Sequence, residues 1–205
     1  MKYDFRSYRI ERSCNKEYKQ YKRYKEWLKK DFHSRCAYCN LREDRITTPF
    51  EIDHFIPWAA FRVVRPELNC LYDNLMYACK KCNNAKSDHY AGNIYEKRIK
   101  NNYFYNPVET DYNEIFYRNE MGSICSEDAK GLSMIARLKL NRRIHNLAWI
   151  CDRLDEVLAK LKAKLQDAPE GSTQREEYLK AQSQLLKYYY DCNNIFIAKY
   201  NDKDF

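Results

Sequence analysis

The most regular pattern of apolar and polar positions lies in the last third of the chain. Apolar side chains recur there at helical spacing from residue 129 to about residue 166. The apolar positions are Ile135, Leu138, Leu147, Ile150, Leu154, Val157, Leu158 and Leu161. Pro169 and Gly171 interrupt the pattern, and a second helical segment runs from about residue 174 to 200. We therefore expect a C-terminal αα-hairpin.

A second helical pattern lies near the N-terminus, at residues 15–31. Aromatic side chains recur at every third position in this segment, and lysines recur with the same spacing. The aromatic residues are Tyr18, Tyr21, Tyr24 and Trp27, and the lysines are Lys16, Lys19, Lys22 and Lys25. Asn15 is a suitable N-cap, and neither glycine nor proline interrupts the segment. We therefore expect one basic helix over residues 15–31.

The middle of the chain carries weaker patterns. We expect two β-rich pieces around a turn at 36–57, a loop at 58–73 and a short strand at 74–79. A helix is expected to start within 82–90, with Asn83 near its first turn and Gly92 at its end. Residues 101–125 are irregular and rich in Asn and Tyr. The prediction is an α+β, mostly helical chain in three parts, residues 1–35, 36–100 and 101–205.

Composition favours a globular protein with a polyanionic partner. Only 4 glycines and 5 prolines occur in 205 residues, which argues against an all-β or disordered chain. Lys and Arg total 37 against 29 Asp and Glu, a formal net charge of +8, and the mean hydropathy is −0.86. Residues 1–35 hold 12 basic and 5 acidic residues, so this arm carries most of the excess charge. A basic arm favours nucleic acid as a partner.

The chain is expected in the cytoplasm. It contains no apolar run of about 18 residues that could span a membrane, and no apolar segment typical of a signal peptide follows the first residues. Nine cysteines, an odd number, make a disulfide framework unlikely in a reducing compartment, so we expect some to be metal ligands.

Two C-x-x-C pairs mark a candidate structural metal site. Cys36 and Cys39 form the first pair, and Cys79 and Cys82 form the second. Two intervening residues let both sulfurs of a pair reach one tetrahedral ion, and four thiolates favour Zn²⁺ over iron. Four protein ligands leave no open position, so this zinc is expected to be structural.

The stretch between the pairs holds a candidate catalytic centre. It contains Asp53 and His54, and Asn83 directly follows the last cysteine. A carboxylate and an amide oxygen suit Mg²⁺, and a neutral histidine can take a proton from water. A metal and a base on opposite sides of a phosphate are the minimum set for phosphodiester hydrolysis.

Residues 36–88, read as CAYC…EIDHFIP…NLMYACKKCNNAKSD, resemble the zinc-stapled, McrA-like motif of the HNH endonucleases. The resemblance implies a ββα-metal core that uses Mg²⁺ or Mn²⁺. By position it implies His54 as general base, Asp53 as first metal ligand and Asn74 as the residue that holds the loop. Asn83 matches the second metal ligand, which makes this an H-N-N variant. The resemblance also suggests Glu51 as a helper at the catalytic carboxylate.

The same resemblance places Lys86 at the phosphate. A weaker likeness covers residues 102–150, where NYFYNPVE and AKGLSMIARLKLNRR are similar to an extension of some HNH proteins of anti-phage defence. These include the nuclease subunits of Septu-type and retron-associated systems. That likeness implies an ATPase partner, and the chain has no GxxxxGK[ST] loop with which to bind nucleotide itself.

Several alternatives stay open from the sequence alone. A zinc ribbon that binds nucleic acid without cutting it would explain the cysteines and the charge, but not Asp53, His54 and Asn83 together. The Tyr/Lys segment either packs its aromatic side chains on the zinc module or contacts phosphates with its lysines. The sequence does not separate DNA from RNA as the substrate, and the helical hairpin is compatible with homo-oligomers.

Overall fold

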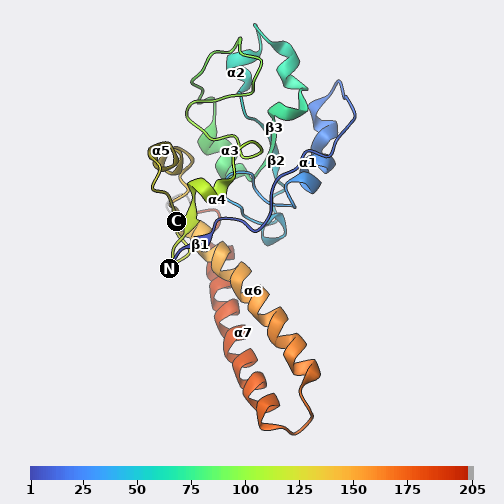
Figure 1. Cartoon of the computed structure of the whole chain (residues 1–205), viewed down its shortest axis with the longest axis vertical. Coiled ribbons are helices and arrows are strands. Elements are labelled where there is room, and N and C mark those ends of the chain that lie inside the picture. Colours follow the sequence, from blue (N-terminus) through green and yellow to red (C-terminus); the bar gives the residue numbers. More distant parts are fainter. Residues whose placement is uncertain (203–205) are drawn as a thin grey trace. The chain divides into compact units, whose positions relative to one another are not determined.

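The computed structural model describes residues 1–202, and it divides them into two compact units that meet at Asn141 (Figure 1). In the first unit the α-helices are α1 (Lys25–Asp31), α2 (Trp58–Phe61), α3 (Lys80–Lys86), α4 (Tyr112–Ile115) and α5 (Ala129–Leu138). Short 3-10 helices are η1 (Tyr21–Tyr24), η2 (Glu43–Arg45), η3 (Pro66–Asn69) and η4 (Tyr72–Asn74). The strands are β1 (Tyr3–Asp4), β2 (Glu51–His54), β3 (Leu75–Ala78), β4 (Tyr117–Arg118) and β5 (Ile124–Cys125). The mixed class with about half the chain helical agrees with the expected α+β fold.

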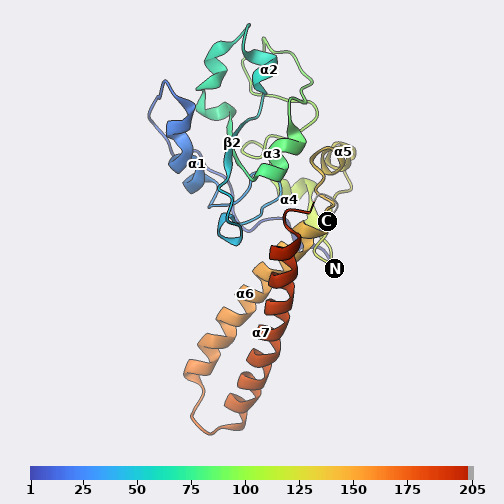
Figure 2. The ribbon, with the colours of Figure 1, turned by 180° about the vertical axis from the view of Figure 1, so that it is seen from behind.

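The strands form two small antiparallel sheets. One has the order β1-β4-β5, and the other pairs β2 with β3. In the second sheet Glu51 lies opposite Ala78 and His54 lies opposite Leu75. Helix α3 packs against β2, and both views show α3 beside this sheet (Figure 1; Figure 2). The pair of strands and α3 form the expected ββα core.

The second unit is the predicted αα-hairpin. It consists of α6 (Arg143–Asp167) and α7 (Thr173–Lys199), which pack along each other. The Ser172 side chain caps α7 by accepting from the Arg175 backbone N–H, and Gly171 adopts φ +73° in the turn. Within the described residues, no helix is both long and apolar enough to cross a membrane.

Two predicted helices are shorter than expected. The basic helix begins only at Tyr21, so Asn15 is not its cap. The preceding residues are held by tertiary contacts instead: the Tyr18 backbone N–H donates to the Tyr24 hydroxyl at 2.9 Å, and Trp27 Nε1 donates to the Tyr18 hydroxyl at 3.3 Å. The single helix expected from residue 129 is in fact α5 and α6. Lys139 adopts the left-handed conformation and ends α5.

The regions around the cysteine pairs also differ from the sequence expectation. Residues 36–50 form no strand beyond an isolated bridge, so β2 has only β3 as a partner. The expected loop at 58–73 contains α2, η3 and most of η4. Helix α3 starts at Lys80 and ends at Lys86, where Ser87 turns at φ 48°. Gly92 therefore does not end this helix. The expected boundaries at residues 35 and 100 both lie inside the first unit.

Candidate functional site

The four cysteines of the two C-x-x-C pairs come together in the first unit. Their sulfur atoms all lie within 4.8 Å of one another, and all four residues are buried. The Cys39 and Cys79 sulfurs are 3.8 Å apart, which is about the separation in a tetrahedron with bonds of about 2.3 Å to zinc. The Cys79 backbone N–H also points at the Cys36 sulfur, 3.4 Å away. This cluster fits a structural zinc ion that ties the first pair to the start of α3.

Strand β2 and helix α3 face each other through four polar side chains. Residues two apart share one face of a strand, and residues three apart share one face of a helix. Glu51 and Asp53 on β2 therefore meet Asn83 and Lys86 on α3. Asn83 Nδ2 donates to Glu51 Oε2 at 2.6 Å, and Lys86 Nζ donates to Asp53 Oδ1 at 2.9 Å.

The Asp53 carboxylate is deeply buried and held on both oxygens. Only 5% of the residue is exposed, and the Lys86 side chain that pairs with it is fully buried. Tyr38, inside the first cysteine pair, donates its hydroxyl to Asp53 Oδ2 at 2.5 Å. Burial, with the nearby Asp53 charge, raises the pKa of Tyr38, so this hydroxyl stays protonated as a donor. Lys86 also donates to the His54 carbonyl, and its side chain is fully buried. In this structure Lys86 therefore offers no exposed atom for the expected contact with a phosphate.

The His54 ring lies on the other face of β2, between aromatic side chains. Its centroid is 4.9 Å from the ring of Tyr21 and 5.5 Å from the ring of Phe61. His54 Nε2 lies 3.0 Å from the Asn69 carbonyl oxygen. A carbonyl can only accept, so Nε2 carries the proton and Nδ1 is left as the basic nitrogen. Burial lowers the pKa of His54, although the Asn69 carbonyl and Asp53 act in the opposite direction.

Asn74 holds the loop that follows His54. It is fully buried, and its Oδ1 accepts from the Ile56 backbone N–H at 2.8 Å. Its Nδ2 donates to the carbonyls of Ile56 and Leu68. Leu68 precedes Asn69, whose carbonyl orients His54. These hydrogen bonds join the loop after His54 to the turn before Asn69, and the loop-holding role of Asn74 stays a prediction.

The catalytic cation implied by the motif has hard oxygen donors on β2 and α3. Glu51 and Asn83 are partly exposed. Asp53 is buried, and the positive charge of Lys86 beside it disfavours binding of a metal cation to the same carboxylate. Because the Asn83 amide nitrogen donates to Glu51, its carboxamide oxygen is the atom left for a ligand role. The donor chemistry of these residues fits Mg²⁺ or Mn²⁺. Glu51 is the more exposed of the two carboxylates on β2.

A basic surface lies beside the candidate base. Tyr21, which packs against His54, is flanked by the exposed residues Lys19, Lys22 and Arg23. The Cys70 thiol donates to the Lys19 carbonyl at 3.1 Å, so this segment is tied to the loop that carries Asn69. The aromatic side chains of the segment pack inward while its basic side chains face solvent. Cationic groups are thus available near His54 for a polyanionic substrate.

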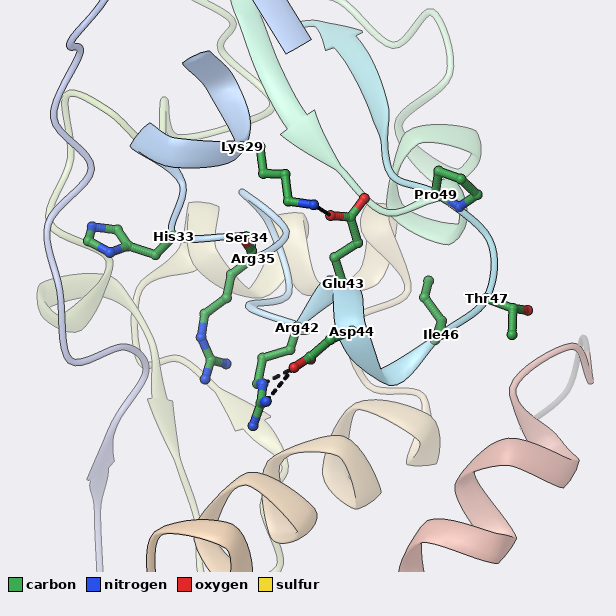
Figure 3. Close-up of a pocket in the computed structure, with 10 residues that line it drawn as sticks. All are labelled: Lys29, His33, Ser34, Arg35, Arg42, Glu43, Asp44, Ile46, Thr47 and Pro49. Carbon is green, nitrogen blue, oxygen red and sulfur yellow. Dashed lines mark hydrogen bonds and ion pairs between the residues drawn. The ribbon is translucent and has the colours of Figure 1, made fainter. Parts of the chain in front are cut away.

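A separate cavity of about 520 Å³ lies beside the first cysteine pair (Figure 3). Its charged side chains are largely paired with each other. Lys29 lies 2.8 Å from Glu43, and Arg42 binds Asp44. His33 lines this cavity and packs on Tyr8. We assign no chemistry to His33 or to this cavity.

Two further histidines lie outside strand β2 and helix α3. His145 is buried in α6, as expected for a structural residue. His89 is exposed, and its carbonyl accepts from Asn101 Nδ2. Tyr38 and Asn69, in contrast, were not predicted as part of the site. Asn69 acts through its backbone carbonyl, which has no signature in the sequence, whereas the place of Tyr38 inside a C-x-x-C pair was an available signal.

Comparison with known proteins agrees with this geometry. Residues 36–89 match the family model described as HNH endonuclease. The chain is 30% identical over 113 residues to the Septu protein PtuB of Bacillus thuringiensis, covering 54% of this chain and 38% of that protein. No solved structure matches the chain significantly. The resemblance of this segment to the HNH endonucleases is confirmed, and the match to a Septu protein agrees with the weaker likeness.

Proposed function

We propose that this chain is a metal-dependent HNH endonuclease that hydrolyses phosphodiester bonds in DNA. The observation that carries the proposal is the placement of His54, with Nδ1 as its basic nitrogen, at the end of a strand whose other face carries Glu51 and Asp53. The cluster of four cysteines includes Cys79 and Cys82, at the start of the helix that carries Asn83.

The residues divide the reaction between them. Nδ1 of His54 takes a proton from water, and the resulting hydroxide attacks the scissile phosphorus. The Asn69 carbonyl keeps the ring in the required tautomer. Asn83 and Glu51 would hold the divalent cation, joined by Asp53 once the Lys86 ammonium moves away from its carboxylate, while Asn74 fixes the loop that supports His54. When bound, Mg²⁺ or Mn²⁺ supplies neutralisation of charge on the phosphate and on the leaving 3′ oxygen.

The similarity to a Septu protein supports a role in anti-phage defence with an ATPase partner. The aligned part of this chain spans only 38% of that relative's length, so the proposed defence role rests on similarity to part of that protein. In that role the ATPase would regulate cleavage by this chain. Co-purification of the chain with the product of a neighbouring ATPase gene, and the effect of that protein on cleavage, test this part of the proposal.

The activity itself is tested with labelled DNA and RNA of the same sequence. We expect cleavage of DNA with added Mg²⁺ or Mn²⁺, and a loss of at least about 100-fold in Asn83→Ala. Lys97→Ala, an exposed lysine in a loop outside the site, is the matched control and should cut as wild type does. Tight binding without metal-dependent cleavage, with or without a partner, would favour the zinc-ribbon alternative instead.

A further inference from the structure

An exposed tryptophan lies close to the candidate base. Trp58 is 49% exposed, whereas Trp27 and Trp149 are more buried. Val63 and Val64 follow on the same segment and are 83% and 42% exposed. Tryptophan is enriched at binding interfaces, because its ring offers a large apolar surface.

Packing fixes this tryptophan relative to His54. The Trp58 ring stands edge-on to Phe61 at 5.2 Å and 87°, and Phe61 in turn packs on the His54 ring. Helix α2 starts directly after Ile56 and Pro57, and Asn74 binds both backbone groups of Ile56. Trp58 is therefore held at a set position on one side of the base.

The surroundings of Trp58 are positively charged. Arg62 is exposed and continues the helical backbone of α2, so it lies on the same face as Trp58, four residues earlier. Tyr21, which also packs on His54, lies in a segment with the exposed residues Lys19 and Lys22. An aromatic ring among cations is complementary to nucleic acid, which offers flat bases along an anionic backbone.

We propose that Trp58, with Arg62 beside it, forms a base platform on which unpaired nucleobases of the substrate stack. The proposal deepens the proposed nuclease function and rests on it. In an intact duplex each base face is covered by its neighbours, so an open face is available only in a single strand or where the duplex is locally unpaired. The substrate class is therefore nucleic acid with unpaired bases next to the scissile phosphate.

The platform is tested by binding, without added divalent metal, so that the outcome does not depend on catalysis. The probes are a 20-nucleotide oligothymidine, an abasic oligomer of the same length and charge, and a matched duplex. We expect wild type to prefer oligothymidine over both others. Trp58→Ala should weaken its binding about 5- to 100-fold, the effect of one stacked base, and leave the abasic oligomer unaffected. Trp58→Phe should retain most of the affinity.

Controls separate stacking from damage to the fold. Zinc content and thermal unfolding of Trp58→Ala should match wild type, and Met121→Ala, 71% exposed in the turn between β4 and β5, should bind all probes normally. Equal binding of oligothymidine and the abasic oligomer by wild type would overturn the platform. So would unchanged binding by Trp58→Ala, which would leave this surface to a protein partner. Absence of cleavage alongside base-dependent binding would count against the nuclease, not the platform.

Discussion

At the scale of single residues, burial sets the pH at which His54 can act as a base. Burial disfavours the charged imidazolium and lowers the pKa of His54 below its ordinary value of 6.5. Since the base must be neutral, activity should be low below that pKa, rise through it and level off before neutral pH. Single-turnover rates at saturating metal, from about pH 5 to 8, measure this profile.

A rate that stays flat across this pH range, with chemistry rate-limiting, would rule out His54 as the titrating base. His89→Ala is the matched control, because the His89 side chain is exposed and its bond to the Lys86 carbonyl comes from the backbone N–H, which alanine keeps. It should keep both the rate and the profile of wild type.

The second residue-scale prediction concerns the buried ion pair of Asp53 and Lys86. Lys86→Met removes the cation and leaves a buried carboxylate that still accepts from the Tyr38 hydroxyl. We expect the free energy of unfolding to fall by about 3–5 kcal/mol, measured by urea denaturation. Adding Asp53→Asn should recover part of this loss, because the uncompensated charge is removed. A Lys86→Met variant as stable as wild type would show that the pair is not formed.

At the scale of elements, the four-cysteine cluster brings the segment 36–39 to the start of helix α3. Residues 36–39 precede β2 by more than ten positions, and Cys79 and Cys82 lie at the start of α3. Cys39→Ser should lose zinc and melt at a lower temperature, measured by elemental analysis and thermal unfolding. Cys125→Ser, outside the cluster, should keep both. Full zinc content and an unchanged melt in Cys39→Ser would contradict the assignment.

The elements show which features a sequence can predict. Strand β3 and helix α7 have a clear local pattern, and both were found close to their expected bounds. The late start of the basic helix was not predictable, because the Tyr18 N–H is bound by the Tyr24 hydroxyl through a tertiary contact. The end of α5 was missed because Lys139 adopts a left-handed conformation usually taken by glycine.

The candidate site divides in the same way. The sequence motif pointed to Asp53, His54, Asn74 and Asn83, because the residue types and their spacing can be read directly from the sequence. The sequence could not predict which group sets the tautomer of His54, because that group is the backbone carbonyl of Asn69, 15 residues along the chain.

At the scale of the whole molecule, the first unit carries the candidate site and a core of its own. Its buried side chains include Leu28, Phe32, Phe55, Leu75 and Met134, all before Asn141. A fragment of residues 1–141 should therefore fold, bind zinc and unfold cooperatively without the helical hairpin. A fragment that is unfolded or lacks zinc would show that the hairpin is required for the fold of this unit.

The central claim is that His54 is the base of a metal-dependent nuclease. The most direct measurement incubates supercoiled plasmid at low salt with the purified chain or His54→Ala, with Mg²⁺, Mn²⁺ or no added divalent metal. The account predicts metal-dependent nicking or linearisation by wild type and none by His54→Ala, with equal zinc content and thermal stability in the two proteins. Cleavage by His54→Ala at the wild-type rate would contradict it.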